Sequence, residues 1–295
     1  MNNKLTAIST FLRVAEAGSF SAAARQTGIK QSAVSQQIAA LEDELGVVLL
    51  HRTTRTMKLT EQGERYRRDM QLVLDAMGEA ERRLHPADHR VQGRVHVQLP
   101  SGLGQIILPH LLALQRLHPE LQLMISLDDR LADLVTEGVD VAIRLSSEPP
   151  QAHAARVLAR IEAALFAAPG SQAVHAVSEL TTLPHVRFSG IPLDAPLRLI
   201  SDEETVEVNV NTVFRANTSD ALLQALESGI GIGGMQLPLA AHALQSGRLV
   251  PVLPAWRLPD RVLYAVYPDA RFIPPRVRSI IDVIEQLLPE MTERV

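Results

Sequence analysis

Four polar side chains between residues 31 and 36 have the types and the spacing needed to recognise another polymer. Ser32, Ser35 and Gln36 lie with Ala39 on the outward face of an expected helix over 31–45, which Gln31 opens. A glutamine amide can pair through two hydrogen bonds with an adenine edge, and small side chains let a helix enter a major groove. The opposite face carries the apolar stripe Val34, Ile38, Leu41 and Leu45. These residues predict a DNA-reading helix; an ordinary solvated helix face is the alternative.

Two shorter elements precede this helix and would position it. An apolar-periodic helix ends at Gly18, and an alanine-rich helix over 21–27, capped by Ser19 or Ser21, ends at Gly28. Two helices that meet at a glycine turn are typical of a helix-turn-helix, in which the second helix reads the bases. Ser21, at the start of the alanine-rich helix, is a further candidate DNA contact.

A basic ribbon follows over residues 47–59. Its ends alternate as two strands, and its tip carries Arg52, Thr53, Thr54 and Arg55. Guanidinium and hydroxyl groups on a hairpin tip suit phosphate or minor-groove contacts, so Arg52, Thr53 and Arg55 are candidate DNA ligands. The alternative is a strand edge that charge protects from aggregation.

A long helix over 61–84 is expected next, with Thr60 as its N-cap. Its apolar residues step by four and three, which is the spacing of a heptad seam. They are Tyr66, Met70, Val73, Met77, Ala80 and Leu84. The seam favours pairing with a second copy, although packing on the helix's own domain would also use it. Pro86 then ends the helix, and residues 85–92 form a hinge.

The composition limits the class of protein. The chain of 295 residues has 46% hydrophobic residues and no cysteine, which excludes disulfides and thiolate chemistry. Residues 1–60 hold seven basic and four acidic residues, a net charge of +3, which leaves −7 for the rest of a chain of net charge −4. A basic head on an acidic body suits a nucleic-acid partner. With no signal peptide and no membrane span in the sequence, we expect a cytoplasmic protein.

Residues 93–295 alternate strands and helices. Strands are expected at 94–99, 121–127 and 139–145, with a helix over 102–117 and a short one over 131–137 between them. This order predicts a parallel sheet with helices on its faces. A second set has strands at 163–168, 185–188, 206–217, 230–235 and 262–267 and helices at 219–228 and 238–246, before a last helix over 276–288. We therefore expect two α/β subdomains, one of 93–161 with 268–295 and the other of 162–267.

A ligand cleft is expected where the strands of the two subdomains end. Ser101, Gly102 and Leu103 open one helix there, and Asn217, Thr218 and Ser219 open another. Free N–H groups and a positive dipole end suit a small organic anion at such termini. Ordinary N-capping by Ser101 and Ser219 is the alternative. Arg144 could pair with the anion, with Asp128 or with Asp140.

Other chemistries find less support in the sequence. His85 and His89 have helical zinc-ligand spacing, but Pro86 separates them and no further ligand is near. The glycine run at 229–234 lacks the spacing of a nucleotide loop, and no nucleophile elbow is present. We expect no metal, no cofactor and no catalysis. A solute-binding protein would share the second half of the chain, but residues 1–84 argue against it.

Taken together, these motifs resemble the LysR-type transcriptional regulators. The resemblance is carried by residues 11–24, 31–38, 41–42, 45–46, 52–55 and 59–63, and then by 100–111, 135–144 and 227–236. It implies a winged helix-turn-helix over 1–60, a dimerising linker helix and an α/β effector domain resembling type 2 periplasmic binding proteins. It also implies that the third helix reaches base edges through Gln31, Ser32, Ser35 and Gln36. The implied partners are double-stranded promoter DNA, a small-molecule effector, and further copies of the chain in a homodimer or homotetramer, with no membrane. Many members have Arg where Gln36 stands and Phe where His51 stands, so base preference cannot be copied from a relative.

Overall fold

The chain forms two compact units, which divide between His89 and Arg90. This computed structural model describes residues 2–52, 57–82, 91–130, 133–151, 153–268 and 273–292. The division falls inside the expected hinge, whose residues 85–90 lie outside the described ranges, as do His85 and His89 themselves. None of the helices in these ranges has the length and hydropathy that a membrane crossing requires.

The first unit is a three-helix head with a two-stranded wing. Its elements are α1 Asn2–Ala17, α2 Phe20–Thr27, α3 Gln31–Leu45, β1 Leu50–Arg52, β2 Met57–Leu59 and α4 Glu61–Arg82. Phe11, Val34 and Ile38 are fully buried at its centre, where α1 packs against the other three described helices of the unit. Burial of the Val34–Ile38 stripe leaves the polar face of α3 outside, as the spacing of these residues predicts.

Helix α4 uses its apolar residues in two ways, which corrects the single seam expected from the sequence. Tyr66 and Met70 pack on the core of the head, and the Tyr66 ring lies 5.7 Å from that of Phe11 between centroids. Val73 and Met77, farther along, are 46% and 43% exposed. Tyr66 and Met70 cover the hydrophobic core of the head, so the first half of the seam packs within the chain. Only the second half is open to a partner.

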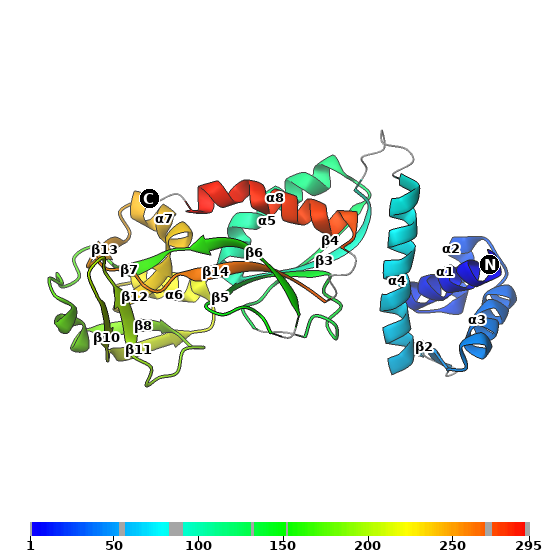
Figure 1. Cartoon of the computed structure of the whole chain (residues 1–295), viewed down its shortest axis with the longest axis horizontal. Coiled ribbons are helices and arrows are strands. Elements are labelled where there is room, and N and C mark those ends of the chain that lie inside the picture. Colours follow the sequence, from blue (N-terminus) through cyan, green and yellow to red (C-terminus); the bar gives the residue numbers. More distant parts are fainter. Residues whose placement is uncertain are drawn as a thin grey trace. The chain divides into compact units, whose positions relative to one another are not determined.

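The second unit contains a mixed five-stranded sheet in the order β4-β3-β5-β14-β6. The strands are β3 Gly93–Leu99, β4 Leu121–Leu127, β5 Val141–Ser146, β6 Ala154–Ile161 and β14 Arg261–Tyr267. Strands β3, β4 and β5 are parallel, as predicted, whereas β14 runs antiparallel to both β5 and β6. Helices α5 Ser101–Leu117 and α8 Pro275–Thr292 cover one face of this sheet (Figure 1).

A second five-stranded sheet has the order β11-β8-β12-β7-β13. It consists of β7 Ala163–Ala167, β8 Pro184–Phe188, β11 Asn211–Ala216, β12 Ile232–Gln236 and β13 Val250–Val252. Helices α6 Ser219–Glu227 and α7 Leu237–Gln245 pack on one face. The other face is covered by a 3₁₀ turn at Val177–Thr181 and by the hairpin of β9 Leu197–Ile200 and β10 Thr205–Val208.

The sheets differ from the sequence prediction in several places. Strand β14 lies in the first sheet, so the expected second subdomain of 162–267 ends too late. An alternating strand at the end of one α/β set does not reveal which sheet it joins, because partner choice is not local. Strands β6, β9 and β13 were not predicted, and residues 134–138 form turns where a helix was expected.

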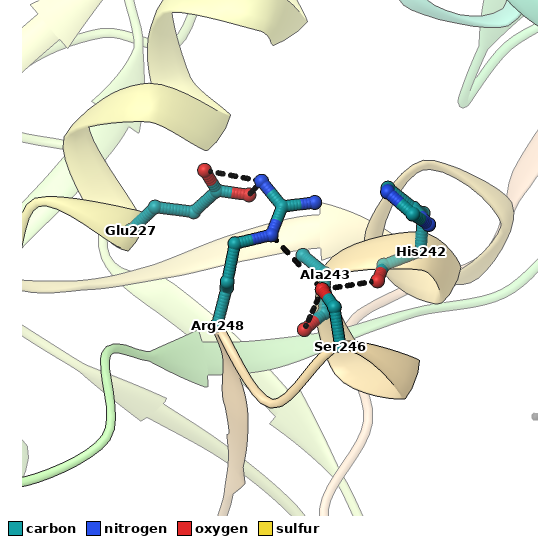
Figure 2. A network of polar contacts seen from close by, with 5 residues as sticks. All are labelled: Glu227, His242, Ala243, Ser246 and Arg248. Atoms are coloured by element: carbon teal, nitrogen blue, oxygen red, sulfur yellow. Dashed lines mark hydrogen bonds and ion pairs between the residues drawn. The ribbon is translucent and has the colours of Figure 1, made fainter.

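One polar network ties the end of α6 to the turn after α7. The Arg248 guanidinium donates to both carboxylate oxygens of Glu227, at 2.8 and 2.9 Å, and its Nε donates to Ser246 Oγ (Figure 2). The Ser246 hydroxyl in turn donates to the carbonyls of His242 and Ala243. This ion pair, in which Nη1 of Arg248 contacts both carboxylate oxygens, links the two helices at the far end from Thr218.

Candidate nucleic-acid interface and effector site

Helix α3 presents the expected polar face to solvent. Gln31, Ser32 and Gln36 are exposed and Ser35 is half-buried, whereas Val34 on the opposite side is fully buried. The amide and hydroxyl groups of this face are therefore available for hydrogen bonds to base edges.

The turn before α3 is built by Ser19 and Gly28. Ser19 caps α2, since its Oγ accepts from Ala22 N at 3.1 Å, while Ser21 is exposed beside it. Gly28 adopts a φ of 69°, in the left-handed region that glycine enters without strain. The chain can thus reverse within a few residues and set α3 across α2, the arrangement of a helix-turn-helix.

The wing is held to α3 by one carboxylate. Glu42 Oε1 accepts from Leu49 N at 2.8 Å and from Leu50 N at 3.0 Å, where β1 begins. Strands β1 and β2 pair antiparallel, with His51 opposite Lys58. The backbone of Arg52 ends β1. The predicted contacts Thr53 and Arg55 lie outside the described residues, as does the side chain of Arg52.

Helix α4 crosses the start of the wing at very short range. A Cβ added to Gly63 would lie 2.0 Å from the Leu49 carbonyl oxygen and 2.9 Å from its carbon. Thr60 is buried here and caps the helix, because its Oγ1 accepts from Gly63 N at 2.9 Å and donates to Val48 O at 2.8 Å. The first turn of α4 and the wing therefore form one unit.

We expect Gly63→Ala to destabilise the head by roughly 2–3 kcal/mol, because the methyl group would displace the Leu49 backbone. Urea unfolding of the full chain followed by circular dichroism measures this loss, and DNA binding should weaken with it. The exposed neighbour variant Gln62→Ala is the control and should unfold like the parent. A Gly63→Ala protein of unchanged stability would contradict the close approach.

In the second unit, the first turn of α5 is occupied by a carboxylate of the chain itself. Ser101 N donates to Asp129 Oδ1 at 3.0 Å, and the Ser101 hydroxyl donates to Asp129 Oδ2. Pro100, rather than Ser101, is the N-cap residue. Asp129 therefore occupies the N–H and hydroxyl groups of Ser101 at which an anionic ligand is expected from the sequence.

The first turns of α5 and α6 lie in direct contact. A Cβ added to Gly102 would lie 2.8 Å from Ser219 Cβ and 3.1 Å from Ser219 Oγ. Thr218 is the N-cap of α6, with its side chain accepting from Ala221 N, and Asn217 before it is exposed. The two predicted helix ends are thus brought together. Leu103 is 1% exposed and belongs to the hydrophobic core, so its side chain is not open to a ligand.

Arg144 lies on the face of the first sheet opposite α5. It donates to the Oε1 of the buried Gln98 at 3.3 Å, and burial lowers its pKa while the charges of Glu137 and Asp128 raise it. Asp128 itself accepts from Arg130 Nε at 2.7 Å, a contact that lowers the pKa of the Asp128 carboxyl. Asp140, the other partner considered for Arg144, accepts from His96 N at 2.8 Å.

Asp129 is a site residue that is not among those expected from the sequence. The signal was present, because a carboxylate that follows the expected strand 121–127 must lie near the end of the parallel neighbour strand 93–99. A helix opens directly after that neighbour strand, at Ser101. Parallel strands end at one edge, so these two positions were bound to meet.

Comparison with known proteins agrees with this architecture. The family model "LysR substrate binding domain" matches residues 88–289, and "Bacterial regulatory helix-turn-helix protein, lysR family" matches residues 5–64. The transcriptional regulator DmlR of Escherichia coli is 33% identical over 98% of this chain and 97% of its own length. The regulator PtxR of Pseudomonas aeruginosa is 31% identical over 94% of this chain and 91% of its own length.

Solved structures are similar over the same extent. CrgA, a LysR-type transcriptional regulator from Neisseria meningitidis, has a TM-score of 0.59 at 26% identity, covering 98% of this chain and 99% of its own. The Vibrio cholerae virulence activator AphB has a TM-score of 0.57 at 26% identity, covering 95% and 98%. Regulators of this kind bind DNA and small-molecule effectors and form oligomers. The chain belongs to the LysR-type transcriptional regulators, with a helix-turn-helix DNA-binding unit followed by a substrate-binding effector domain.

Proposed function

We propose that Gln31, Ser32, Ser35 and Gln36 of α3 read base edges in the major groove of promoter DNA. The observation that carries this proposal is the exposed polar face of α3 above a buried Val34–Ile38 stripe. Ser21 and the wing residues Arg52, Thr53 and Arg55 contact the DNA backbone or minor groove, where they fix orientation rather than sequence.

Alanine variants separate these two roles. Arg52→Ala and Arg55→Ala should each weaken binding to all DNA sequences. Each should also reduce the slope of the logarithm of the binding constant against the logarithm of the salt concentration by about one unit. Gln31→Ala and Gln36→Ala should instead relax preference at single base pairs, each at a cost of roughly 1–3 kcal/mol. Binding to sites selected from a random DNA library, measured at several salt concentrations, distinguishes them. Uniform loss in the glutamine variants would remove them from base reading.

The effector in this proposal is a small organic anion held between the two subdomains of the second unit. Its carboxylate would take the place of Asp129 at the first turn of α5 and face Thr218 and Ser219 on α6. Gly102 supports this placement, because its missing side chain leaves the two helix ends close together. Arg144 and Asn217 complete the polar set on either side. Asp129 then acts as an internal competitor that the effector must displace.

The assembly in this proposal is a homodimer through α4, paired into a homotetramer, in the cytoplasm. Val73 and Met77 support it, since they are exposed one helical turn apart on a helix whose Tyr66, Met70 and Leu74 pack on the core of the head. A reader of one half-site gains affinity and specificity when two copies bind adjacent half-sites.

A further inference from the structure

One arginine of the second sheet, on strand β8, is buried. Arg187 lies on β8 between Val186 and Phe188, and only 8% of its surface is exposed. Arginine is almost never buried to this degree without a partner, because removing a charge from water is costly unless another charge compensates.

No such partner exists within the described part of the chain. The Arg187 side chain makes no hydrogen bond and no ion pair with any described residue, whereas its backbone belongs to the β8–β11 ladder. Burial lowers its pKa, and the positive charge of Arg215 lowers it further. Arg187 is therefore a partly desolvated cation beside a second cation, which is an arrangement that an anion would stabilise.

Two residues near Arg187, Arg215 and His185, also carry groups that could contact an anion. Arg215 on β11 is opposite Arg187 in the parallel register, and its Nη2 donates to the carbonyls of Ser189 and Ile191 at 2.6 and 2.5 Å. These bonds hold the second guanidinium over the loop that follows β8. His185, two residues before Arg187 and 1% exposed, has an Nε2 with no partner among the described residues.

The place of Arg187 in the fold separates it from the proposed effector site. Val186 packs with Leu222 of α6 on one face of the sheet. Alternation along β8 therefore places Arg187 and His185 on the other face, which Leu199 and Val208 of the β9–β10 hairpin cover. Thr218 and Ser219 open α6 on the first of these faces.

We propose that Arg187, supported by the charge of Arg215, binds a small oxyanion beneath the β9–β10 hairpin. Carboxylate and phosphate share the required chemistry, which is a pair of oxygens that can accept two parallel N–H bonds from one guanidinium. The loop from Ser189 onward lies next to this ligand, so occupancy would brace the connection between β8 and β9.

Titration calorimetry of the full-length protein tests the site, with inorganic phosphate as one probe and succinate as the other. Potassium chloride of equal ionic strength is the blank. We expect saturable binding of at least one probe to the parent protein, and the stronger of the two identifies the source of the anion. Arg187→Met, which keeps the apolar stem, should weaken that binding at least about tenfold. Arg198→Met removes an exposed arginine of the same hairpin and should bind like the parent.

Thermal unfolding is a second measurement, and it distinguishes an anion-binding arginine from one with a purely structural role. Without added anion, Arg187→Met should melt no lower than the parent, because it removes a partly desolvated charge that no described residue compensates. The anion should raise the melting temperature of the parent but not of the variant. Arg187→Lys should keep weakened binding, since a point charge replaces the fork. Binding no stronger than that of chloride, or equal binding by Arg187→Met, would overturn the proposal.

Discussion

Replacing Val73 and Met77 together with glutamate is expected to convert the protein to monomers and to weaken operator binding by about 10²–10⁴-fold. Both side chains are more than 40% exposed on α4. In a homodimer through this helix the change would bury four carboxylates in an apolar contact, which costs several kcal/mol. Loss of the second head also removes the gain in effective concentration that two linked half-site readers share.

Light scattering of the full-length protein, with DNA binding measured in parallel, checks this expectation. Gln71→Glu is the control for an added carboxylate on α4, because a separation of two residues places Gln71 on the side of the helix opposite Val73. The control should remain oligomeric. If the double variant kept the mass of the parent assembly, the exposed half of α4 would not be the interface. Folding of the head should be unaffected, since neither residue contacts its core.

The head could be predicted from the sequence almost to the residue. Helices α2 and α3 are set by local signals, namely the Ser19 cap, the left-handed Gly28 and the Val34–Ile38 stripe. It could not be predicted in the same way that the first half of α4 packs on the head while Val73 and Met77 remain exposed. A heptad pattern records that apolar residues share a face, but it does not record whether that face meets its own head or another chain.

The second unit was predictable as alternating strands and helices, but its sheet order was not. Strand β14 joins β5 and β6 across more than a hundred residues of sequence, and no local pattern encodes that pairing. The candidate site divides along the same line. Ser101 and Thr218 could be predicted as site residues because each lies where a strand passes into a helix. Asp129 and Arg187 could not, because their roles depend on neighbours that only the fold brings close to them.

The response to the effector should depend on Asp129 in a direction opposite to its dependence on Ser101. Ser101→Ala combined with Thr218→Ala removes two hydroxyls from the converging helix ends and should abolish the response to an anionic effector. Asp129→Ala should instead strengthen anion binding by about tenfold, because it removes a like charge from the same N–H groups. Asp129→Asn removes the charge and keeps the shape, so it should strengthen binding as well.

A panel of small carboxylates, including acetate, succinate and benzoate, provides the probes for these variants, with binding and DNA affinity measured on the full-length protein. Thr218→Ser is the control, because it keeps the cap of α6 that alanine would lose at about 1 kcal/mol. DNA affinity without effector should stay close to that of the parent in every variant, since none of them touches the head. The two aspartate variants separate competition from support. If Asp129 only stabilises the first turn of α5, Asp129→Ala will weaken anion binding. If Asp129 competes with the effector, Asp129→Ala and Asp129→Asn will both strengthen anion binding, because the N–H group of Ser101 then becomes available to the ligand.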